Sequence, residues 1–161
     1  MSRPEPRFHI ALLHPEIGPN TGNIGRLCLG VRARLHLVHP LGFRTDEKAV
    51  RRAGLDYWKH VDVVEHDNAD AFFAWVADRP LHLFSARGEQ AYIDCPYEPG
   101  SVLLFGRESR GLPQELVDQH GAFRIPLEPA VRSLNLANAV AVVAYTALPK
   151  VAPELFAPAG T

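Results

Sequence analysis

The chain of 161 residues contains only two cysteines, Cys28 and Cys95. Two are too few for a disulfide framework or a cysteine zinc site, and they fit a protein of the reducing cytoplasm. We expect no signal peptide, because the first residues are polar and contain prolines. The longest apolar stretch, residues 136–148, is shorter than the roughly 20 residues that cross a bilayer, so we expect no membrane contact.

Net charge is scarce as well, since 17 basic and 18 acidic residues leave −1. This balance excludes a uniformly basic nucleic-acid coat and an acidic disordered tail. The charge is unevenly distributed, with +5 over residues 1–60 and −6 over residues 61–161. A neutral protein with a basic half can still hold a polyanion on one face.

The hydrophobic pattern alternates between short apolar runs and helical spacings. We expect strands at residues 8–13, 35–39, 61–65, 81–85, 101–105 and 123–126. We expect helices after the loop 14–23 and at residues 47–53, 69–77, 113–120 and 135–148. This order predicts an α/β fold with a mainly parallel sheet and helices on both faces. Residues 1–150 are the expected single domain, and residues 151–161 the expected C-terminal tail.

Ligands of such sheets bind beyond the carboxyl ends of the strands, which directs attention to three loops. The first, residues 14–23, is rich in glycine, proline and asparagine. Asn20 or Thr21 could cap the next helix, with Arg26 merely peripheral, or the loop could hold an anion or a ribose. Its glycines match neither the dinucleotide fingerprint nor the P-loop, so neither of those nucleotide sites is expected.

The other two loops, residues 106–112 and 127–135, are also rich in polar groups. Glu108 could pair with an arginine in a plain turn, or the loop between its two glycines could form a site. Ser133 or Asn135 could cap the last helix, whereas Asn138 inside that helix needs a partner. The histidine spacing matches no zinc motif, most histidines are expected at the surface or in strands, and we expect no metal. No serine-hydrolase elbow occurs either.

Together the three loops resemble the motifs of the SPOUT class of RNA methyltransferases, and the sequence is most similar to the TrmL (YibK) type. The matching segments are PNTGNIGRLC at 19–28, FGRESRGLP at 105–113 and IPLEPAVRSLNLANAVAVVAY at 125–145. RRAGLDYW at 51–58 is also typical of this subgroup. The resemblance covers roughly residues 8–147.

The resemblance implies an α/β fold whose C-terminal segment forms a deep trefoil knot that binds S-adenosylmethionine. It implies a homodimer whose active site uses residues of both subunits. The implied reaction is methylation of the ribose 2′-hydroxyl of the wobble nucleotide, cytidine or a modified uridine, in leucine tRNAs. The residues implied to bind the cofactor are Phe84, Gly106, Ile125, Leu127, Ser133 and Leu134.

The resemblance also implies catalytic and substrate-binding positions. The catalytic ones are Arg26, Glu108, Ser133 and Asn135. Those expected to bind tRNA are Asn20, Arg51, Arg52 and Arg110, the two adjacent arginines because residues 32–52 carry a net charge of +4. A guanidinium offers donors and no acceptor, so Arg26 suits phosphate binding and alkoxide stabilisation as well as the role of a base.

The sequence departs from the subgroup at three positions. Arg32 replaces a glycine at the end of the first helix, Arg107 replaces a proline in the second motif, and Thr146 replaces a glutamate in the third. Three alternatives stay open: a related enzyme acting on another tRNA or rRNA position, a knotted RNA-binding protein without catalysis, and an unrelated doubly wound ligand-binding domain.

Overall fold

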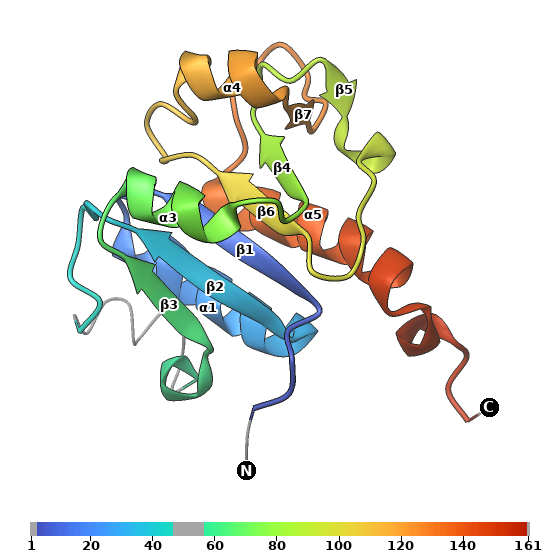
Figure 1. Cartoon of the computed structure of the whole chain (residues 1–161). Coiled ribbons are helices and arrows are strands. Elements are labelled where there is room, and N and C mark those ends of the chain that lie inside the picture. Colours follow the sequence, from blue (N-terminus) through green and yellow to red (C-terminus); the bar gives the residue numbers. More distant parts are fainter. Residues whose placement is uncertain (1–2, 47–56, 161) are drawn as a thin grey trace.

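A seven-stranded sheet forms the centre of the protein, with strand order β3-β2-β1-β6-β4-β7-β5 (Figure 1). The computed structural model describes residues 3–46 and 57–160. All strand pairings in this sheet are parallel. The strands are β1 (Phe8–Leu13), β2 (Ala33–Val38), β3 (Val63–His66), β4 (Leu81–Phe84), β5 (Gln90–Ala91), β6 (Val102–Phe105) and β7 (Phe123–Arg124). The α-helices are α1 (Gly18–Val31), α3 (Ala69–Val76), α4 (Gln114–His120) and α5 (Leu136–Val151).

Helices cover both faces of the sheet, as the hydrophobic pattern predicts. On β1, Ile10 and Leu12 pack in one cluster with residues of α1 and α5. Ala11 and Leu13 pack in a second cluster with residues of α3 and α4. This division follows from the alternation of side chains along a strand. The α/β class is therefore confirmed, whereas the trefoil knot stays a prediction.

The starts of the two long helices agree with our expectation for α5 but not for α1. The N-cap of α1 is Ile17, so the prediction that Asn20 or Thr21 caps this helix is wrong, and both lie in its first turns. At its other end Arg32 adopts a left-handed conformation, with φ 58° and ψ 51°, which explains why a glycine suits this position. Asn135 caps α5, as predicted.

The C-terminal part is more regular than a frayed tail. Helix α5 continues past Leu148 and includes Pro149, and a 3₁₀ helix, Pro153–Phe156, follows it. Asn138, expected to need a partner inside the helix, is exposed. The predicted helix at 47–53 lies outside the described residues. None of the helices in the described ranges is long and apolar enough to cross a membrane.

Candidate active site

Glu108, in the loop after β6, ties that loop to the one after β1. Its carboxylate accepts the backbone N–H groups of Glu16 and Ile17, at 2.8 and 2.7 Å, and the side-chain amide of Asn20, at 3.3 Å. Helix α1 has no side-chain cap and no acidic residue in its first turn, so Glu108 supplies the negative charge that this helix terminus favours. The interpretation of Glu108 as the partner of an arginine in a plain turn is therefore wrong.

The third loop joins the same network through Asn135. Its side-chain amide donates to the Oδ1 of Asn20 at 3.1 Å. The Oδ1 of Asn135 in turn accepts the backbone N–H groups of Ala137 and Asn138 at the start of α5. Asn20, Glu108 and Asn135, which lie far apart in the sequence, thus form one hydrogen-bonded line that fixes all three loops.

A second set of hydrogen bonds, which the sequence did not reveal, also joins the first two loops. Here the first loop supplies the carboxylate and the second loop the donors. The carboxylate of Glu16 accepts the hydroxyl of Ser109 at 2.7 Å and its backbone N–H at 2.9 Å. These hydrogen bonds lower the pKa of Glu16, and the charges of Arg107 and Arg110 add to the effect. Each loop therefore contributes one glutamate that binds the other loop.

Replacing Glu108 with glutamine is expected to destabilise the protein by about 1–3 kcal/mol, because the amide nitrogen then faces donors that need an acceptor. Chemical denaturation measures this difference. Glu115→Gln, which removes the same charge from an exposed position of α4, is the matched control and should change the free energy of unfolding by under about 0.5 kcal/mol. Equal values for the two variants would contradict the structural role of Glu108.

A pocket of about 500 Å³ lies between the loops that follow β4 and β6 and the third loop. This volume is in the range of small-molecule sites. The ring of Phe84, at the end of β4, stacks on that of Phe105 with centroids 5.0 Å apart and forms part of the wall. All six residues expected to bind the cofactor line this pocket: Phe84, Gly106, Ile125, Leu127, Ser133 and Leu134.

Gly106 is needed because the backbone of its own loop returns against it. A Cβ atom at this position would lie 2.0 Å from the carbonyl carbon of Gly111 and 2.2 Å from the nitrogen of Leu112. The loop is closed by the N–H of Gly111, which donates to the carbonyl of Arg107 at 2.8 Å. Gly111 itself has a φ of +67°, so the two glycines serve two different backbone requirements.

Some of the remaining candidate residues line the pocket, and others do not. Ser133 and Arg110 line the pocket together with Glu108. Arg26 does not: it lies exposed on α1 with its guanidinium 5.1 Å from the ring centroid of Tyr57. Arg51 and Arg52 lie outside the described residues.

Sequence reasoning missed three further arginines that line the pocket, Arg87, Arg107 and Arg132. Arg87 is held within the chain, since it donates to the Oε1 of Gln114 and to the carbonyl of Leu112. It follows β4, and this loop was not among the three that the composition singled out. Arg107 and Arg132 lie in two of the three loops that were singled out. Their positions next to polar candidates could have identified them as pocket residues.

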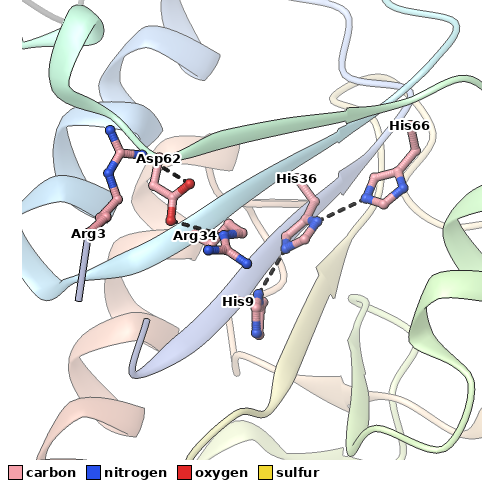
Figure 2. Close-up of polar contacts among 6 residues, drawn as sticks. All are labelled: Arg3, His9, Arg34, His36, Asp62 and His66. Carbon is pink, nitrogen blue, oxygen red and sulfur yellow. Dashed lines mark hydrogen bonds and ion pairs between the residues drawn. The ribbon is translucent and has the colours of Figure 1, made fainter. Parts of the chain in front are cut away.

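A chain of three buried histidines lies away from the pocket, one each from β1, β2 and β3 (Figure 2). The Nδ1 of His9 and the Nε2 of His36 are 2.9 Å apart, and so are the Nδ1 of His36 and the Nε2 of His66. Trp75 of α3 packs over His36 with ring centroids 4.3 Å apart. His9 and His36 lie in strands as expected, whereas His66 lies one residue beyond the expected strand 61–65, and the burial of the three was not anticipated.

Burial lowers the pKa of His9 to about 4 and that of His36 to about 2, and the charge of Arg34 adds to both effects. Arg34 lies beside the chain in an ion pair with Asp62, which also pairs with Arg3 (Figure 2). In the parts of the chain that the structure describes, no group of three or more His, Cys, Asp or Glu side chains is arranged to hold a metal ion.

Acid is expected to destabilise the protein through this histidine chain. In the unfolded chain the pKa of His9 and His36 is near 6.5. Below this pH the two histidines are protonated in the unfolded state, whereas burial keeps them neutral in the folded state. Stability is therefore complete above pH 6.5 and falls as the pH is lowered toward 4. Since each histidine changes the free energy of unfolding by about 1.4 kcal/mol per pH unit, denaturation at pH 5 should show a loss of about 2–4 kcal/mol relative to pH 8.

His36→Phe should make this pH dependence shallower, because one of the suppressed protonations is removed. His60→Gln, which replaces an exposed histidine outside this chain of three, is the matched control and should leave the pH dependence unchanged. A free energy of unfolding that is constant from pH 8 to pH 5 would show that the buried histidines do not control acid stability.

The parallel sheet, the three tied loops and the pocket define the class: an α/β domain whose pocket lies at the carboxyl ends of the strands, where such sheets bind ligands. The chain belongs to the SpoU rRNA Methylase family, which it matches over residues 7–145. This membership confirms the resemblance that the three motifs indicate.

Individual relatives are similar over most of their length. A tRNA (cytidine(34)-2′-O)-methyltransferase of Burkholderia pseudomallei is 46% identical over 145 residues, which span 87% of this chain and 93% of that relative. A solved structure that addresses the 2-OH methylation of C/U34 on tRNA is 43% identical, has a TM-score of 0.87, and covers 91% of this chain and 97% of its own. An AdoMet-bound rRNA methyltransferase of Sinorhizobium meliloti is 28% identical, with a TM-score of 0.80 over 89% of this chain and 56% of its own.

Proposed function

We propose that this chain acts in the cytoplasm and transfers a methyl group from S-adenosylmethionine to the ribose 2′-hydroxyl of the wobble nucleotide, a cytidine or a modified uridine, in leucine tRNAs. The observation that carries the proposal is the pocket, because all six expected cofactor residues, Ser133 among them, line one cavity beside Glu108. The 46% identity to a tRNA (cytidine(34)-2′-O)-methyltransferase supports the choice of nucleotide 34.

The residues present fit S-adenosylmethionine. Phe84 offers an aromatic face for the adenine, the small Gly106 permits close backbone approach, and Ile125 and Leu127 add apolar wall. The cofactor, when bound, supplies a methyl group activated on a sulfonium. The chain must then bring the ribose oxygen into line with that group, and positioning supplies much of the rate in such displacements.

The catalytic candidates have separate tasks in this proposal. Glu108 and Asn135 fix the loops through Asn20, which makes them positioning residues. Ser133 lies in the pocket wall, where its hydroxyl can contact the substrate. Arg26 has donors to hold a phosphate and stabilise the oxygen as the 2′-hydroxyl loses its proton. We further propose that the protein is a homodimer, in which Arg26 of one subunit completes the pocket of the other.

The test is incubation of the purified protein with radiolabelled S-adenosylmethionine and, in separate reactions, bulk tRNA and rRNA, followed by mapping of ribose methylation. Label at the 2′-oxygen of nucleotide 34 in leucine tRNAs is the expected result. Label at another tRNA or rRNA position would redirect the proposal to a related enzyme. Cofactor binding without transfer to any RNA would favour a knotted RNA-binding protein without catalysis.

A further inference from the structure

The walls of the pocket carry more positive charge than the proposed cofactor can use. Among the residues that the structure describes, four arginines and one carboxylate, that of Glu108, line it. That carboxylate is already bound by two backbone N–H groups and one amide of the first loop. S-adenosylmethionine carries two positive groups and one negative group at neutral pH, so a cationic wall opposes its net charge. The arginines therefore suit a different, anionic ligand.

Arg107 is the arginine most clearly placed for such a ligand. Its backbone is fixed by the bridge to Gly111, and its side chain is half-buried in the pocket wall. Within residues 3–46 and 57–160, no hydrogen bond or ion pair occupies its guanidinium. The charge of Arg107 helps to lower the pKa of the Glu16 carboxylate, but that carboxylate already accepts two hydrogen bonds from Ser109.

We propose that Arg107, together with Arg132 of the third loop, binds a phosphodiester of the RNA next to the ribose that is methylated. This inference rests on the proposed function. The reactants offer two kinds of oxyanion, the single carboxylate of the cofactor and the phosphates that flank every ribose. A guanidinium binds either in a fork of two hydrogen bonds, but the phosphates deliver the net negative charge that this wall lacks. Arg107 is thus an RNA-binding residue of the pocket, in addition to Arg110.

The test compares Arg107→Gln with Arg79→Gln, which removes the same charge from the turn after α3, where the guanidinium of Arg79 packs on Trp75 outside the pocket. Filter binding of tRNA is measured from low to moderate salt, and cofactor binding is measured by calorimetry. Arg107→Gln should weaken tRNA binding about three- to tenfold at low salt and reduce the slope of log K against log salt by about one. Cofactor affinity should stay within about twofold, and Arg79→Gln should match the wild type in both assays.

A neutral methylphosphonate identifies the contact itself. Anticodon stem-loops that carry it on the 5′ or the 3′ side of nucleotide 34 should bind the wild type more weakly at one of these positions. The same substitution should have no further effect on Arg107→Gln, because the partner charge is gone.

Two outcomes would overturn the proposal. A large loss of cofactor affinity with an unchanged salt slope would assign Arg107 to the carboxylate of the cofactor. Unchanged binding of both ligands would show that its charge serves neither. Because RNA binding is measured without turnover, failure of the wild type to methylate tRNA would count against the proposed function and not against this contact.

Discussion

Gly106→Ala is expected to abolish binding of S-adenosylmethionine, with a loss of at least about 100-fold in affinity. The added methyl group would lie 2.0 Å from the backbone of Gly111, where no side chain can move aside. The second loop must then open, and this displaces the pocket wall that includes Phe105 and Arg107. Isothermal calorimetry with the cofactor measures the effect directly.

Gly30→Ala is the matched control, since a Cβ at this helical position meets nothing within 4 Å. Its cofactor affinity should equal that of the wild type, and its stability should rise by about 0.5–1 kcal/mol from improved helix propensity. Circular dichroism must show that both variants fold. A folded Gly106→Ala protein with normal cofactor affinity would mean that this pocket is not the cofactor site.

Local features of the fold were predictable because the residues that form them are adjacent in the sequence. The apolar run 8–13 coincides with β1, and the helix expected at residues 69–77 agrees with α3, Ala69–Val76, to within one residue. The start of α1 was not predictable in this way. Its terminus is bound by Glu108, which is 91 residues from Ile17, and no local pattern reveals such a partner.

The contacts of the candidate site and of the histidine chain were likewise predictable only in part. Residues in loops at the carboxyl end of one parallel sheet could be assigned to one place, and the line from Glu108 through Asn20 to Asn135 bears this out. The histidine chain could not, because its members come from three strands, and their contact depends on the pairing registers. His9, His36 and His66 share no spacing that a single sequence displays.

Of all the sequence features, the uneven distribution of charge is the one whose interpretation the structure changes most. The division into a basic half and an acidic half suggests that RNA binds the first and the cofactor the second. In the described part of the chain, however, the four arginines that line the pocket come from residues 61–161, the half with a net charge of −6. Most acidic residues of that half lie outside the pocket. The net charge of residues 61–161 therefore conceals the local excess of positive charge at the pocket. RNA contact is therefore expected at the pocket as well as along residues 32–52.

Arg26→Ala is expected to lower the rate of methyl transfer by at least about 100-fold while cofactor affinity stays unchanged. The two effects separate because Arg26 does not line the pocket in its own chain. It is exposed on α1, and the contact of its guanidinium with Tyr57 is worth only about 0.5–1 kcal/mol, so the fold should survive. Asn23→Ala, at another exposed position of α1, is the matched control and should retain full transfer.

Mixed dimers decide whether Arg26 acts across the subunit boundary. Arg26→Ala retains an intact pocket, and Gly106→Ala retains an intact Arg26, so each variant alone should be inactive. In a mixed dimer, the pocket of the first meets Arg26 of the second and forms one complete site, and co-refolding equal amounts should restore roughly a quarter of the wild-type rate by random pairing. No recovery, with mixed dimers present by native mass spectrometry, would place Arg26 within its own subunit's site. Normal transfer by Arg26→Ala alone would remove Arg26 from the mechanism.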